Sequence, residues 1–209
     1  MKRAKIITGI ARFLSTALTP LLAGTYGTLL VLWTSVLCLL PYGTRVMTLV
    51  TVMGITCILP LMIIGALHHF KYIHDRRLND RNERLVPYVA AVACYVAAVF
   101  YLQHIHSPQW FVMFMAGSAV AVALDALINV AWKISAHLTG LGGMVALIYQ
   151  IHVQGLSAFN LFYLLCGIIV LAGLVGTSRL VLKCHTVMQV LAGFALGYVC
   201  VTLAMKLFG

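Results

Sequence analysis

Long apolar runs separated by short polar breaks dominate the sequence. Seven runs are long enough, or nearly so, to cross a hydrocarbon layer of ~30 Å as helices. They are roughly residues 13–40, 46–70, 87–105, 109–131, 137–152, 158–177 and 186–207. The run 137–152 is short and rich in glycine, so six crossings is the alternative. With no internal repeat and no break suited to a linker, the pattern predicts one all-α domain over residues 1–209: a polytopic transmembrane helical bundle.

Composition supports a membrane protein and excludes a soluble domain. The chain is 63% hydrophobic and 9% charged, whereas soluble domains average about 25% charged residues. The opening "MKRAKIITGIARF" is basic, but the apolar run after it is too long for a cleaved signal peptide. The six cysteines are dispersed without a CxxC pair, so their spacing predicts neither a disulfide framework nor a zinc site.

The distribution of basic residues predicts an orientation. If seven spans alternate the breaks between two sides, all lysines and arginines except Arg45 and Lys206 fall on the side of the N-terminus. By the positive-inside rule that side is cytoplasmic. The net charge of +10 is then explained by topology and by anionic headgroups or substrate. No basic stripe with interleaved aromatics is present, so nucleic acid is not an expected partner.

Three breaks on this basic side carry unusual polar residues. They are "HDRRLNDRNERLVPY" (74–88), "WKISAHLTGLGG" (132–143) and "SRLVLKCHTVMQ" (178–189). The planar fork of arginine binds phosphate oxygens in pairs, and a helix starting near Ser135 would offer free backbone N–H groups. A metal-dependent hydrolase would need clustered carboxylates or closely spaced histidines, whereas the acids here alternate with arginines. The breaks therefore predict an anionic ligand.

The same breaks carry three motifs in a familiar order. Ser178–Arg179, five residues and then His185 resemble the third motif of the type 2 phosphatidic acid phosphatase family, SR-x5-H-x3-D. The stretch Ile134–His137 corresponds to the second motif, PSGH. Arg77, six residues and then Arg84 correspond to the first, K-x6-RP. The resemblance covers about residues 71–200.

Several positions depart from the family pattern. Arg77 replaces a lysine, Pro87 is displaced by two positions, and Ala136 replaces the glycine of PSGH. Gln189 replaces the aspartate that orients the nucleophilic histidine in the family. An amide can accept a hydrogen bond from imidazole but stabilises an imidazolium less than a carboxylate does. The replacement of this aspartate by Gln189 therefore bears on the rate of the expected reaction more than on the reaction type.

The resemblance implies a role for each motif residue. His185 would attack phosphorus and form a phosphohistidine, while His137 would protonate the leaving oxygen and later act as base. The expected phosphate-binding groups are Arg77, Arg84, Ser135, Ala136 and Arg179. No metal and no cofactor is required.

Asp125 is an ionisable residue within an apolar span, which by default suggests a function. Asp125, Asn129 and Lys133 fall on one helical face. Asp125 would either support His185 in place of the missing carboxylate or pair with Lys133 to close the helix end. With Gln189, Asp125 and Lys133 are the residues expected to support the site.

The expected protein is a membrane-integral lipid phosphate phosphatase acting through a phosphohistidine. The substrates that fit are phosphatidylglycerophosphate, phosphatidylinositol phosphate, phosphatidic acid or a polyprenyl phosphate. Similarity to small bacterial members favours the bacterial inner membrane, with the site on the cytoplasmic side. One alternative is a protein that binds lipid phosphates without turnover, which the replacement at Gln189 would support. A second is a transporter, for which Asp125 is the only candidate site residue.

Overall fold

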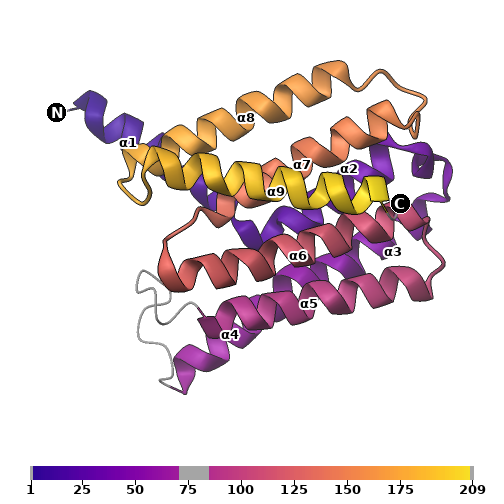
Figure 1. Cartoon of the computed structure of the whole chain (residues 1–209), viewed down its shortest axis with the longest axis horizontal. Coiled ribbons are helices and arrows are strands. Elements are labelled where there is room, and N and C mark those ends of the chain that lie inside the picture. Colours follow the sequence, from indigo (N-terminus) through magenta and orange to yellow (C-terminus); the bar gives the residue numbers. More distant parts are fainter. Residues whose placement is uncertain (1, 71–84, 208–209) are drawn as a thin grey trace.

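The computed structural model describes residues 2–70 and 85–207, and within these ranges the chain is helical without β-strands. Figure 1 shows the helices running roughly alongside one another. The elements are α1 (Lys2–Ala17), η1 (Pro20–Leu22), α2 (Ala23–Thr34), η2 (Val36–Leu39), α3 (Tyr42–Met53), η3 (Gly54–Ile58), α4 (Leu59–His69), α5 (Leu85–His104), α6 (Gln109–Ala131), α7 (Ala136–Val153), α8 (Phe162–Val181) and α9 (Val187–Leu207). The predicted all-α bundle is confirmed.

Six segments are long and apolar enough to cross a membrane. They are Lys5–Thr34, Tyr42–His69, Val86–His104, Gln109–Ala131, Phe162–Val181 and Val187–Leu207. The first is interrupted between α1 and α2, where Pro20 opens η1, because proline can begin a helical turn but not continue one. The second contains a π-helical turn, η3, between α3 and α4. The chain is therefore an integral membrane protein.

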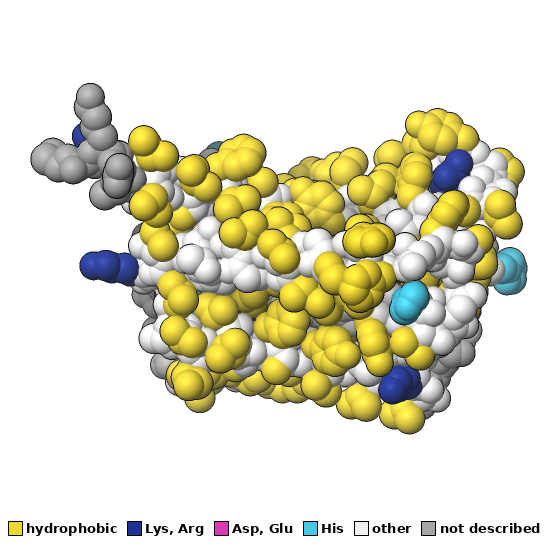
Figure 2. Space-filling model, turned by 90° about the horizontal axis from the view of Figure 1, so that it is seen from above, with side chains coloured by type: hydrophobic (Ala, Val, Ile, Leu, Met, Phe, Trp, Pro, Cys, Tyr) yellow, Lys and Arg dark blue, Asp and Glu magenta, His cyan; other side chains and the backbone are white. Residues whose placement is uncertain are grey.

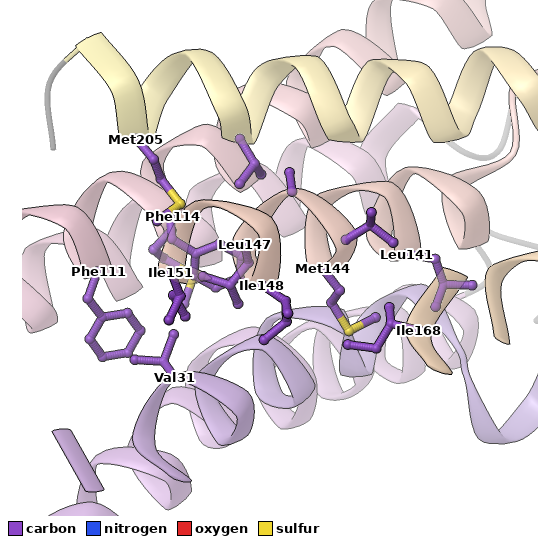
Figure 3. Close-up of a cluster of buried hydrophobic side chains, with 14 of the residues drawn as sticks. Val31, Phe111, Phe114, Leu141, Met144, Leu147, Ile148, Ile151, Ile168 and Met205 are labelled. Atoms are coloured by element: carbon purple, nitrogen blue, oxygen red, sulfur yellow. The ribbon is translucent and has the colours of Figure 1, made fainter. Parts of the chain in front are cut away.

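Helix α7 corresponds to the short glycine-rich run and forms the centre of the bundle. It packs against α9, α8, α2 and α6, and most of its residues are buried. Figure 3 shows its side chains Met144, Leu147 and Ile148 among buried neighbours from the surrounding helices, such as Phe114 and Met205. Because other helices surround α7, it need not be as uniformly apolar as the helices that contact lipid.

The outer surface is apolar over the middle and polar at its ends. Large side chains such as Phe100, Leu127 and Val170 are exposed on the outside of the bundle. Figure 2 shows hydrophobic side chains over the middle of one face, with lysine, arginine and histidine only toward its two ends. This pattern matches a hydrocarbon layer between two aqueous boundaries.

Glycines allow α7 and α9 to approach closely. A Cβ at Gly142 would collide with the carbonyl of Phe194, and a Cβ at Gly197 would collide with that of Thr139. Small residues at a helix contact allow such close backbone packing in membranes. The contact fixes the N-terminal half of α7 against the N-terminal half of α9, next to the connections that carry the motif histidines.

Candidate functional site

Three motif side chains meet at one end of the bundle. His137 lies in the first turn of α7, Arg179 in the last turn of α8, and His185 in the connection from α8 to α9. All three line one cavity of about 360 Å³. In Figure 1 the α6–α7 and α8–α9 connections lie at the same end of the bundle as the N-terminus. The structure thus brings the second and third motifs together, as the sequence predicted.

The end of α8 determines where His185 lies. The Lys183 N–H donates to the carbonyl of Leu180 (2.9 Å) and the Cys184 N–H to that of Arg179 (3.0 Å). Lys183 adopts a left-handed conformation with φ 52°. These features define a Schellman motif, which reverses the chain at a helix C-terminus. The reversal at Lys183 comes four residues after Arg179, and His185 lines the same cavity as Arg179.

The start of α7 offers the donors that an anion site needs. Ser135 is the N-cap, and its carbonyl accepts from the N–H groups of Leu138 (2.9 Å) and Thr139 (3.0 Å). Its side-chain hydroxyl is buried and meets no hydrogen-bond partner within the described parts of the chain. Ala136 and His137 begin the helix and line the cavity. Helix N-termini carry positive partial charge from unpaired N–H groups, so this cap suits a bound phosphate.

The side chain of Gln189 bonds to the residue that precedes α9. Its side-chain Oε1 accepts from the backbone N–H of Thr186 (3.0 Å), and its own N–H donates to the Thr186 hydroxyl (3.4 Å). This reciprocal pair is a capping box at the start of α9. The Gln189 carbonyl also accepts from the Ser135 N–H (3.3 Å). Gln189 therefore holds the two motif-bearing connections together.

Asp125 lies inside the bundle and lines the same cavity. It is 1% exposed, and its Oδ1 accepts from the hydroxyl of Thr139 (3.0 Å). That hydroxyl also lies 3.3 Å from the carbonyl of Ser135. Asp125 is thus connected to the N-terminus of α7 through Thr139. Its predicted support of His185, and its alternative pairing with Lys133, stay predictions.

The contacts of Ser15 with Arg179 and His137 were not predicted from the sequence. The Oγ of Ser15, near the end of α1, accepts from Arg179 Nη1 (2.6 Å), and the Ser15 carbonyl lies 3.0 Å from His137 Nε2. The only signal in the sequence is a serine one turn after Ala11 on one helical face, which carries no chemistry by itself.

The first-motif residues Arg77 and Arg84 lie outside the described residues.

The cavity changes character with depth. Next to the histidines it is polar, whereas its remaining walls are mostly apolar, come from α2, α4, α5, α6, α7 and α9, and include Asp125. Leu61, Phe114, Met144 and Val201 represent these walls. Within the described ranges no group of three or more His, Cys, Asp or Glu side chains is placed to hold a metal ion.

Fold and cavity together describe an integral membrane helical protein in which His137, Arg179 and His185 line a cavity at one end of the bundle. Residues 129–209 match the family model described as PAP2 superfamily. The match spans the second and third motifs, and over these residues the chain is similar to the PAP2 superfamily. No curated protein and no solved structure matches the chain.

Proposed function

We propose that this protein hydrolyses the phosphate ester or diphosphate of a membrane lipid. The observation that carries the proposal is the position of His137, Arg179 and His185 at the polar end of a cavity whose interior is mostly apolar. A phosphate would bind among these three side chains. A hydrocarbon chain would extend between the helices, where its burial is favourable.

The proposed reaction uses two histidines in sequence. A ring nitrogen of His185 attacks phosphorus, the bond from phosphorus to the leaving oxygen breaks, and His137 gives that oxygen a proton. Water then attacks the phosphohistidine with His137 as base, which releases inorganic phosphate and restores both imidazoles. Imidazole suits both roles because its ordinary pKa lies near neutrality. No metal takes part in the proposed steps.

Fixed donors would stabilise the charge on the transferred phosphoryl group. Arg179, the Ser135 hydroxyl and the backbone N–H groups at the start of α7 are placed for this role, and the sequence adds Arg77 and Arg84 from the first motif. Donors that are already oriented need no reorganisation in the transition state. The buried hydroxyl of Ser135, which lacks a protein partner among the described residues, supports its assignment to the phosphate.

The substrate class follows from the membrane setting. Phosphatidylglycerophosphate, phosphatidylinositol phosphate, phosphatidic acid and polyprenyl phosphates all combine a surface phosphate with a long hydrocarbon. The basic residues on the side of the N-terminus favour a cytoplasmic site, and the family resemblance favours a bacterial inner membrane. A cytoplasmic site suits an intermediate of lipid biosynthesis.

The test is release of inorganic phosphate by the purified protein in detergent, with EDTA present and a panel of these lipids as substrates. We expect release from at least one lipid and a loss of at least about 10³-fold in His185→Ala, because a nucleophile has no substitute. His152→Ala is the matched control, since His152 lies at the opposite end of α7 and should retain full activity. Release that survives in His185→Ala would contradict the proposed mechanism.

The second candidate function is binding of lipid phosphates without turnover. It is favoured by Gln189, whose amide caps α9 at the position where the family has an aspartate. This candidate predicts saturable binding of a lipid phosphate with no release of inorganic phosphate from any member of the panel.

A further inference from the structure

Helix α1 lies outside the family match at residues 129–209, yet it reaches the site. We propose that Ser15 is a positioning residue that orients both Arg179 and His137 for the phosphoryl group. The site would then be completed by the N-terminal helix. This inference rests on the proposed function and extends it to a residue that no motif includes.

The contact with His137 determines which ring nitrogen carries a proton. A backbone carbonyl can only accept, so the 3.0 Å separation between the Ser15 oxygen and His137 Nε2 requires an N–H at Nε2. A hydrogen bond of this kind fixes both the tautomer and the ring orientation of a histidine. In the neutral imidazole the other nitrogen, Nδ1, then holds the lone pair that exchanges the proton.

The contact with Arg179 fixes the guanidinium. Arg179 Nη1 donates to the Ser15 hydroxyl at 2.6 Å, a short separation typical of hydrogen bonds with a charged donor. The same hydroxyl lies 3.4 Å from His137 Nε2, so one serine contacts both groups. An arginine that is already held in place loses less conformational entropy when it binds an anion.

The packing of α1 makes Ser15 a fixed part of the site. Ser15 is 8% exposed and Ala11, one turn earlier on the same face, is 4% exposed. Helix α1 packs along α8, the helix that carries Arg179. Thr19, Pro20 and Leu21, which follow α1, line the cavity.

The contacts of Ser15 leave room for a phosphate. His137, Arg179 and His185 line the open cavity of about 360 Å³ while both Ser15 hydrogen bonds are formed. Because all three side chains border on the cavity while these bonds are intact, phosphate need not displace Ser15, which favours orientation of the site over competition with the substrate.

The test compares the kinetics of Ser15→Ala, Ser15→Thr and Thr16→Ala. Ser15→Ala removes the hydroxyl but keeps the carbonyl. We therefore expect KM to rise about tenfold, the effect of losing roughly one hydrogen bond to a charged group, with an unchanged dependence of kcat on pH. Ser15→Thr should restore KM. Thr16→Ala is the control, because the exposed Thr16 hydroxyl donates to the Arg12 carbonyl of its own helix, and its KM should equal that of wild type.

Direct binding of inorganic phosphate separates this inference from the proposed function. If wild type binds phosphate about tenfold more tightly than Ser15→Ala but releases none from any lipid, the proposed function fails and the role of Ser15 stands. Equal KM and equal phosphate affinity in Ser15→Ala and Thr16→Ala would overturn the inference. Tighter binding by Ser15→Ala would also overturn it, since the hydroxyl would then be a competitor.

Discussion

At the scale of single residues, the backbone of Lys183 decides where His185 can lie. Its left-handed conformation (φ 52°) closes the Schellman motif of α8, and this conformation costs an L-residue other than glycine roughly 1–2 kcal/mol. His106 provides an internal comparison. It has the same φ and closes the same motif after α5, where the Ser107 N–H donates to Leu102.

Lys183 and His106 share this backbone conformation, so the same substitution can be compared at both positions. We expect Lys183→Val and His106→Val each to lower the free energy of unfolding by more than about 1 kcal/mol, because a β-branched residue fits the left-handed region poorly. Only Lys183→Val should also reduce phosphate release, because only Lys183 adjoins the site. Thermal unfolding in detergent and the phosphate assay measure the two effects. Equal losses of activity in both variants would contradict the proposed role of the α8 end.

The residue scale also shows where sequence reasoning reached its limit. The spacing of Ser178–Arg179 and His185 was sufficient to place both ends of the third motif at one site. Gln189 stands where the family has an aspartate, and the local signal for its position is the capping pattern Thr186-x-x-Gln189. Ser15 contacts residues more than 120 positions away, and no local pattern encodes such a contact.

At the scale of elements, the close contact of α7 and α9 holds the two histidine-bearing segments together. A methyl group at Gly197 would meet the backbone of Thr139 on α7. Backbone atoms cannot move aside as a flexible side chain can, so the helices would have to separate. Such a separation would displace the N-terminus of α7 relative to α9, and with it His137 relative to His185.

We therefore expect Gly197→Ala to lower stability by about 1–3 kcal/mol through overpacking and to reduce phosphate release. Gly173→Ala is the control, because a Cβ at this exposed position of α8 meets nothing within 4 Å. Alanine favours helix over glycine, so Gly173→Ala should be neutral or stabilising. Unfolding temperature and phosphate release measure both variants, and equal behaviour of the two would refute the account of this contact.

Most helices could be predicted from apolar periodicity, because each had to cross a layer of fixed thickness. The break between α1 and α2 lay inside the single predicted run 13–40, since Pro20 is tolerated within membrane spans and gives no definite boundary. The central position of α7 in the bundle could not be predicted from the sequence either. Its short, glycine-rich run left six crossings as the alternative, and only the packing of α2, α6, α8 and α9 around it shows its place.

At the scale of the whole molecule, the bundle has a polar end that carries the motif connections and a mostly apolar interior. The motif connections lie at the end that also carries the N-terminus (Figure 1), and the apolar cavity leads from that end into the bundle. An amphipathic substrate would meet both environments at once. The molecule as a whole thus favours a lipid phosphate over a soluble phosphate ester, although each helix alone indicates only a membrane.

The most direct test of this account is formation of a covalent phosphoenzyme from a ³²P-labelled lipid phosphate, followed by rapid quenching into base, where phosphohistidine survives. We expect a protein-bound label in wild type that is lost on acid treatment and is absent in His185→Ala. His137→Ala should react more slowly while His152→Ala behaves as wild type. A substrate that is hydrolysed without any label on the protein, or a label that persists in His185→Ala, would contradict the assignment of His185 as the nucleophile.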